Sequence, residues 1–247
     1  MKKTIVLIFI IILGISFIYS SETTKKEDFF KRIDNLFEMR KDVSNLKKGI
    51  ALLENYVKKN QSYDAYWRLA KFYYQYGERV PKNKRKNIFF KAVNYGRRAL
   101  LYNKNRVEGH FWLGVAYGKY GEAKGIFKSL SLVKPIKQEM KRVIELDENY
   151  ECGGAYRVLG RLYFKVPGIM GGSKSKSLEY LLKEKKMCPS NILGRYYLAD
   201  TLRKVGKKKE AIAELEYILN LKVVDPRWAP EYDLVRKDAE KLYKKLK

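Results

Sequence analysis

Hydrophobic residues recur at spacings of three and four from about Glu27 to the end of the chain, for example in ALLENYVKK (51–59) and AIAELEYILNL (211–221). Such spacing places the apolar side chains on one face of an α-helix. The alternating pattern and the Asn-Gly or Asp-Gly turns that mark β-hairpins are missing from the sequence. The pattern therefore predicts an all-α protein.

A short motif occurs four times within this helical pattern. Each copy has a leucine, a small residue directly after it, and an aromatic residue or a second leucine three positions beyond the small residue. The first leucines of the copies are Leu69, Leu113, Leu159 and Leu198. The small residue allows a second helix to approach closely, and the large residues fill the space around it. This arrangement is the signature of the first helix, helix A, of a tetratricopeptide repeat.

Small residues and a proline mark the second helix, helix B, of these repeats: Ala92, Ala99, Ala211 and Pro189. The anchoring leucines lie further apart than the roughly 34 residues of a standard repeat, so we expect degenerate repeats with lengthened loops between helices A and B. We place these loops at residues 78–86, 121–134 and 165–175. The sequence thus predicts an α-solenoid, with an irregular first hairpin over residues 27–60 and an amphipathic capping helix over residues 229–246.

The N-terminus has the pattern of a targeting segment. Lys2 and Lys3 precede an apolar run over residues 5–19, and the chain turns polar after Ser20 and Ser21. The run is shorter than the roughly 20 residues that span a bilayer, which favours a cleaved signal peptide over residues 1–20. A short uncleaved N-terminal anchor is the alternative. In either case we expect residues 21–247 to form one tetratricopeptide-like domain in the periplasm or another extracytoplasmic compartment.

The chain carries a formal net charge of +26, and its lysines are spread along the whole sequence. A hydrophobic fraction of 46% is enough for a packed core, so wholesale disorder is not expected. The charge favours anionic partners, such as acidic proteins, small anionic ligands or anionic lipid headgroups. A solvated basic surface without a specific partner is the alternative, and we do not expect nucleic acid to be the partner.

The sequence offers little for catalysis. The glycine-rich segment KVPGIMGGSKSKS (165–177) resembles a phosphate-binding loop, but Ser173 stands where a Walker motif needs glycine, and a helix precedes the segment. We therefore interpret it as a turn between two helices. In this interpretation Gly171 and Gly172 allow positive φ, and Ser173 or Ser175 caps a helix with Glu179 in its first turn. Anion binding by the free amides at that helix start remains an alternative.

A single histidine, His110, falls within a helix A and is interpreted as a core or groove residue. One histidine and two cysteines cannot build a catalytic triad or a metal site with known ligand spacing. We therefore expect a protein that is not an enzyme and that uses no metal and no cofactor.

The two cysteines, Cys152 and Cys188, fall at the start of one helix A and the end of its helix B. These two points lie at the same end of an antiparallel hairpin. An extracytoplasmic compartment would permit a disulfide between them, whereas two separate buried thiols are the alternative.

Helix A lines the concave face of a tetratricopeptide solenoid, so its recurrent inner positions form a candidate groove. Counting from the anchoring leucines, we expect aromatic and cationic side chains there that could bind apolar and anionic groups. Packing of these aromatic residues against neighbouring repeats is the alternative. The candidate groove residues are Trp67, Lys71, Tyr74, Phe111, Lys119, Arg157, Arg161, Phe164, Lys165, Tyr196 and Arg203.

Three segments extend the tetratricopeptide resemblance: VIELDENY (143–150), GGAYRVLGRLYFKVPGIMGGSKSKSLEYL (153–181) and YYLADTLRKVGKKKEAIAEL (196–215). Their order resembles the T-component of TRAP-type transporters, although the lipobox cysteine of that family is missing here. It is also similar to the C-terminal helical domain of the regulator-of-microtubule-dynamics family. The first resemblance implies a homo-oligomer that partners a periplasmic solute-binding protein and holds an apolar ligand.

Two functions from different classes are therefore expected. The first is an extracytoplasmic binding protein that holds a protein partner, or a small anionic and partly apolar ligand, in its groove. The alternative is an adaptor at a membrane surface, whose basic face binds anionic lipid and recruits an envelope complex.

Overall fold

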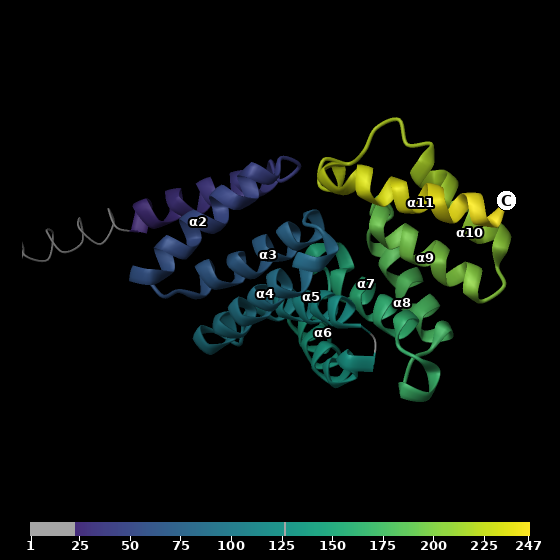
Figure 1. Cartoon of the computed structure of the whole chain (residues 1–247), viewed down its shortest axis with the longest axis horizontal. Coiled ribbons are helices and arrows are strands. Elements are labelled where there is room, and N and C mark those ends of the chain that lie inside the picture. Colours follow the sequence, from purple (N-terminus) through teal and green to yellow (C-terminus); the bar gives the residue numbers. More distant parts are fainter. Residues whose placement is uncertain (1–22, 126) are drawn as a thin grey trace, which may run out of the picture.

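The computed structural model describes residues 23–125 and 127–247, and every regular element in these ranges is helical (Figure 1). The predicted all-α fold is confirmed. After a helix over residues 23–38, the order is α2 (Val43–Lys59), α3 (Tyr63–Arg79), α4 (Lys82–Tyr102), α5 (Val107–Lys124), η1 (Phe127–Leu132), α6 (Val133–Asp147), α7 (Tyr150–Lys165), η2 (Gly168–Met170), α8 (Lys174–Met187), α9 (Ile192–Lys204), α10 (Lys208–Leu219), η3 (Ala229–Glu231) and α11 (Tyr232–Leu246).

The four predicted copies of helix A are α3, α5, α7 and α9, and each packs on the helix that follows it. The small residues of the motif are needed for this packing. A Cβ atom at Gly114 would lie 2.3 Å from Met140 of α6, and one at Gly160 would lie 2.6 Å from Leu181 of α8. The hairpins of a tetratricopeptide-type solenoid are therefore confirmed as the unit of the fold.

One of the three predicted long loops is wrong, and a second is shorter than expected. Only Val80 and Pro81 separate α3 from α4, which is a helix of 21 residues. The first turns of α4 are rich in lysine and have no periodic hydrophobic residues, so the sequence did not indicate that they are helical. Helix α5 extends to Lys124 and α6 begins at Val133, so the second predicted loop is shortened at both ends and contains η1. The extra length of the first of these repeats therefore lies in its helices.

The third predicted loop, between α7 and α8, is present. Ser173 caps α8 by accepting a hydrogen bond from the backbone N–H of Lys176, and Gly171 has a φ of 88°. Gly172 has no positive φ; instead, a Cβ atom there would lie 1.8 Å from the carbonyl oxygen of Val166. Because α8 begins at Lys174, Glu179 falls in its second turn and not in its first.

The two ends of the solenoid also form helices. The first hairpin consists of the helix over residues 23–38 and α2, and it is regular where an irregular one was expected. At the other end, α11 packs on α9 and α10 as the predicted capping helix. No helix in the described ranges has the length and hydrophobicity needed to cross a bilayer. The predicted signal peptide, residues 1–20, lies outside the described residues.

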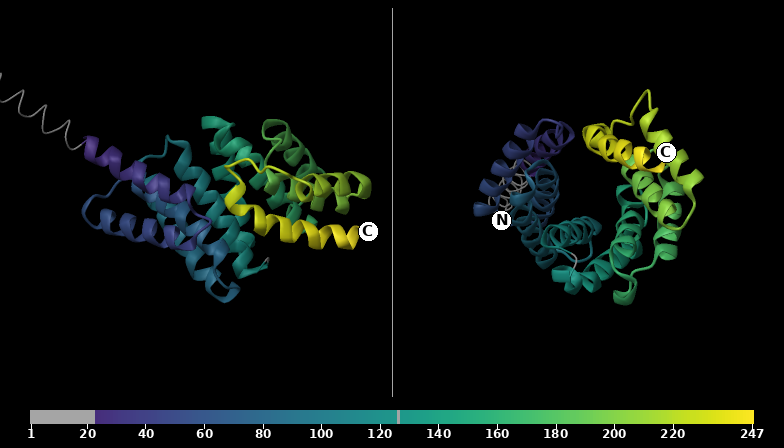
Figure 2. Two further views of the ribbon diagram at one scale, coloured as in Figure 1. Left: turned by 90° about the horizontal axis from the view of Figure 1, so that it is seen from above. Right: turned by 45° about the vertical axis from the view of Figure 1, so that its right-hand side comes forward.

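The hairpins follow a curved path that brings the first hairpin close to the segment before α11 (Figure 2). The turn after the first helix meets the segment before α11, where Arg40 Nε donates a hydrogen bond to Glu231 Oε1 at 2.8 Å. Arg79 of α3 pairs with the same carboxylate at 3.1 Å. The solenoid is thereby closed into a ring.

Candidate binding cavity

The ring encloses a cavity of about 810 Å³. Its wall combines helices A of three repeats and the start of α9 with residues of the first hairpin and of the segment that closes the ring. Large apolar side chains form much of this wall, among them Phe37, Phe111, Trp112, Ile136 and Trp228. Cationic side chains outnumber acidic ones in the same wall.

Most of the candidate groove residues line this cavity: Lys71, Tyr74, Phe111, Lys119, Arg157, Arg161 and Lys165. The remaining four, Trp67, Phe164, Tyr196 and Arg203, do not. Trp67 and Phe164 are buried by packing, each 8% exposed. In α9 the neighbouring residue, Tyr197, faces the cavity in place of Tyr196.

The cationic residues of the wall are largely paired with acidic residues. Arg161 lies 2.9 Å from Asp200 of α9, and Lys71 lies 3.8 Å from Glu151. Lys119 lies 3.0 Å from Glu78. These acidic partners come from other helices, so the sequence positions of the cations did not indicate them. Arg203, which does not line the cavity, shares the carboxylate of Asp200 with Arg161.

A buried ion pair joins Arg157 of α7 to Glu184 of α8 at 2.9 Å. Burial raises the pKa of Glu184 to about 7, against the opposing effect of Arg157 and Arg195. A Cβ atom at Gly194 of α9 would lie 2.1 Å from the same carboxylate. The pair is thus held between three helices, and we assign Arg157 a structural role in the wall.

Donors without acceptors gather at the C-terminal end of α7. Lys165 is exposed and makes no ion pair or hydrogen bond within the described part of the chain, and Arg161 Nε is buried without an acceptor. Partial desolvation, together with the positive charge of Arg161, lowers the pKa of Lys165. Trp228, elsewhere in the wall, also has an Nε1 donor without an acceptor. The wall can therefore accept an anionic group beside an apolar one.

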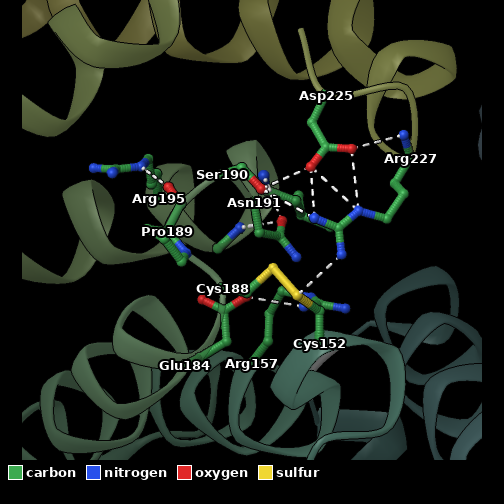
Figure 3. The surroundings of a disulfide bond; sticks show 12 residues. Cys152, Arg157, Glu184, Cys188, Pro189, Ser190, Asn191, Arg195, Asp225 and Arg227 are labelled. Carbon is green, nitrogen blue, oxygen red and sulfur yellow. Dashed lines mark hydrogen bonds and ion pairs between the residues drawn. A yellow bond between two sulfur atoms is a disulfide. The ribbon is translucent and has the colours of Figure 1, made fainter.

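A disulfide joins Cys152 to Cys188, whose Cα atoms lie 5.5 Å apart, and Cys152 lines the cavity (Figure 3). The pairing that the sequence left open is thus present in the structure. Cys152 lies in the middle of a left-handed turn in which Glu151, Cys152 and Gly153 have φ values of 47°, 60° and 69°. Arg227, held by Asp225, lies 3.6 Å from Cys152 Sγ.

His110 is buried outside the cavity. Its Nδ1 lies 2.6 Å from Glu139 Oε2, and its Nε2 lies 2.9 Å from the carbonyl oxygen of Lys104. Both ring nitrogens therefore have structural partners. Within the described residues, His, Cys, Asp and Glu side chains form no group that could hold a metal ion.

Sequence reasoning missed the residues that close the ring, Arg40, Arg79, Arg227, Trp228 and Glu231. Arg40 and Glu231 are 191 positions apart and meet only because the solenoid curves back on itself. Arg40 belongs to none of the four motif copies, and Glu231 falls within the predicted capping helix. No periodic signal in the sequence could have paired them.

Comparison with protein families gives one match that spans most of the chain. The model of the family described as "RMD1-3: Regulator of microtubule dynamics protein 1-3" matches residues 29–247. Regulator of microtubule dynamics protein 3 of Rattus norvegicus is 24% identical over 208 residues, which cover 77% of this chain and 43% of that protein. Regulator of microtubule dynamics protein 1 of Pongo abelii is 26% identical over 127 residues, or 51% of this chain and 39% of that protein. The chain thus spans less than half the length of the curated relatives it matches.

Solved structures match the fold at low sequence identity. A thermophilic tetratricopeptide protein of Thermus thermophilus has a TM-score of 0.60 at 16% identity, covering 84% of this chain and 98% of that one. PilF of Pseudomonas aeruginosa has a TM-score of 0.54 at 14% identity, covering 88% and 89%. These matches confirm the tetratricopeptide-type fold. They give no support to the resemblance to the T-component of TRAP-type transporters.

Proposed function

Because this chain belongs to the regulator of microtubule dynamics protein 1-3 family, we propose that it is a scaffold that binds a protein partner in its central cavity. Tetratricopeptide proteins and proteins of this family are typically non-catalytic scaffolds. A scaffold needs a surface that is concave, chemically distinct and accessible. The cavity inside the ring has these properties.

One observation supports the choice of occupant. The cavity combines an aromatic wall with cationic donors that lack acceptors, namely Lys165 and Arg161 Nε. Its volume of about 810 Å³ lies within the usual size of a ligand pocket. We therefore propose that the occupant is anionic and partly apolar, either an acidic segment of a protein partner or a small ligand with these properties.

Two variants test this proposal without disturbing the fold. Gly118 lines the cavity, and a Cβ atom there would meet no other atom within 4 Å, so Gly118→Leu would extend a side chain from this position to fill part of the cavity. Lys165→Ala removes a cation that holds no structural partner. The exposed residue Lys104 offers a matched control, Lys104→Ala, outside the cavity.

The probe is anilinonaphthalene sulfonate, an apolar anion whose fluorescence rises in a desolvated site. We expect saturable binding to the wild type, a loss of about fivefold to tenfold in affinity for Lys165→Ala, equivalent to about 1 kcal/mol, and no saturable binding for Gly118→Leu. Lys104→Ala should bind as the wild type does. Equal binding by all four proteins would exclude the cavity as the site.

Two more specific proposals concern the cellular location of the protein and the identity of its partner. We propose an extracytoplasmic location, which the Cys152–Cys188 disulfide supports because such bonds persist in oxidising compartments. A more specific form of the proposed function is a homo-oligomer that serves a solute-binding protein as a transport accessory. The comparisons with known proteins do not support this form. Fractionation of cells that produce the full chain would test the location directly.

The second candidate function is an adaptor at a membrane surface. A specific observation favours it, because residues 127–137 and 165–176, in two loops of the structure, include several lysines and no acidic residue.

A further inference from the structure

Two neighbouring loops of the solenoid form a surface that we call the loop face, defined as residues 127–137 and 165–176. The first loop contains η1 and leads into α6, and the second contains η2 and leads into α8 (Figure 1, lower edge). Tyr163 of α7 lies between them: Lys137 Nζ is 4.5 Å from the centre of its ring, and Lys176 Nζ is 5.7 Å from it. The two loops therefore lie side by side.

The loop face has no acidic residue in either segment. Its lysines include Lys128, Lys134, Lys137 and Lys176; none of these four forms an ion pair within the described chain, although Lys137 and Lys176 lie over the ring of Tyr163. Other lysines of the molecule, such as Lys119 and Lys71, are paired with carboxylates. The positive charge of the loop face is thus free to act on a partner.

Large apolar side chains project from the same two loops. Ile169 is 92% exposed, Phe127 is 79% exposed and Met170 is 45% exposed. Ile169 and Met170 belong to the short helix η2, where the chain turns between Pro167 and Gly171. Exposed apolar residues rimmed by polar ones mark an interaction surface.

The combination of free lysines with protruding apolar tips fits a lipid surface better than a soluble polyanion. Each lysine near an anionic membrane contributes about 1 kcal/mol of attraction. Apolar tips gain further free energy by entering the boundary between headgroups and acyl chains. A soluble polyanion such as RNA or polyglutamate would use the lysines but would leave Ile169 in water.

We propose that the loop face docks on a membrane surface that contains anionic lipid. This inference rests on the second candidate function, the membrane-surface adaptor, and names the surface that would perform it. The two segments also supply residues of the cavity wall, such as Leu130, Ile136 and Lys165, but the protruding side chains of Phe127, Ile169 and Met170 do not line the cavity.

The test uses the full chain with vesicles of phosphatidylcholine, with and without phosphatidylserine, and measures amide hydrogen exchange. Any attachment through the apolar residues 5–19 would occur on both kinds of vesicle, so the difference between them reports the loop face. We expect exchange to slow severalfold in residues 127–137 and 165–176 only when phosphatidylserine is present. Residues 60–62 and 103–106, which join other pairs of helices, should be unaffected.

Matched variants separate the two contributions. Ile169→Ser combined with Met170→Ser should weaken the phosphatidylserine-dependent binding about tenfold, whereas the control Leu101→Ser, at a residue 83% exposed on α4, should not. Lys128→Glu combined with Lys176→Glu should weaken it at least tenfold. Lys59→Glu combined with Lys104→Glu changes the net charge equally, at exposed positions away from the loop face, and should have a much smaller effect.

Several results would overturn the proposal. Equal protection on both kinds of vesicle, or equal losses in the test and control variants, would exclude docking by the loop face. Protection of the same residues by polyglutamate or RNA, without protection by vesicles, would identify a soluble polyanion as the partner. The serine variants should keep their affinity for anilinonaphthalene sulfonate, so failure of this proposal is distinguishable from failure of the cavity proposal.

Discussion

His110, the single histidine of the chain, is buried, and its hydrogen-bond partners in the folded state determine which protonation state is favoured. Burial acts to lower its pKa, but the hydrogen bonds to Glu139 and to the carbonyl oxygen of Lys104 outweigh this effect, and the net pKa is raised. The protonated ring can donate to both acceptors, whereas the neutral ring can donate to only one. The fold therefore favours the charged form.

This shift predicts a defined dependence of stability on pH. Because the pKa is higher in the folded state, the contribution of His110 to the free energy of unfolding is fully present below its unfolded pKa of about 6.5 and is lost as the pH rises through the folded pKa. His110→Gln should remove this dependence, and at pH 6 it should cost about 1–3 kcal/mol through the loss of a charge-assisted hydrogen bond. Urea unfolding at several pH values measures both effects. An unchanged slope above pH 6.5 in the variant would show that other groups cause it.

At this scale the sequence indicated which positions face inward, but it could not indicate which charges are free. Arg157 and Arg161 have no acidic neighbour along their own helix, yet each meets a carboxylate from another helix, Glu184 and Asp200. Those pairings depend on how adjacent helices pack. A difference of one position also moves a side chain about 100° around a helix, which is why Tyr197 lines the cavity in place of Tyr196.

At the scale of elements, the start of α7 combines a left-handed turn with a covalent anchor. Two of the three residues in the turn, Glu151 and Cys152, are not glycine, and left-handed backbone costs such residues roughly 1–2 kcal/mol each. Residue spacing allowed us to predict that Cys152 and Cys188 share one end of a hairpin. The turn itself has no sequence signal beyond Gly153 and Gly154, so its geometry could not be predicted.

The disulfide should stabilise the protein through the loop that it closes. Its two cysteines are 36 positions apart, and closure of a loop of this size removes unfolded-chain entropy equivalent to about 3–4 kcal/mol. Reduction with dithiothreitol should therefore lower the free energy of unfolding by up to that amount in urea titrations. The double variant Cys152→Ser, Cys188→Ser should match the reduced wild type and should not respond to dithiothreitol. A response of the double variant, or none in the wild type, would contradict this account.

At the scale of the whole molecule, the closed ring distinguishes this protein from an open solenoid. Buried hydrophobic residues form two core clusters, one that ends at Leu159 and one that begins at Leu181, so contacts between neighbouring hairpins maintain most of the fold. The motif spacing was sufficient to predict the hairpins. Closure depends on the sum of small rotations between successive repeats, which no local pattern encodes. The closed ring and the cavity inside it therefore could not be predicted from the sequence.

The closure depends on the carboxylate of Glu231, which pairs with two buried guanidinium groups, Arg40 and Arg79. Glu231→Gln would leave Arg79 without a counter-charge and Arg40 with only the exposed Glu38 at 3.8 Å, and breaking a buried pair costs about 3–5 kcal/mol. Since the two core clusters do not depend on this contact, the ring should open rather than unfold. We expect a larger radius of gyration in small-angle scattering, faster exchange in residues 221–231, and an unchanged helical signal in circular dichroism.

A neighbouring pair serves as the control for this prediction. Lys41 and Asp233 lie 3.1 Å apart across the same junction, but both side chains are 71% exposed. An exposed pair contributes at most about 1 kcal/mol, so Asp233→Asn should leave the radius of gyration and the exchange rates unchanged. If Asp233→Asn opened the ring as far as Glu231→Gln does, closure of the ring would depend on the net charge of the junction and not on the buried carboxylate of Glu231. If neither variant opened it, packing of the segment before α11 would be sufficient to hold the ring closed.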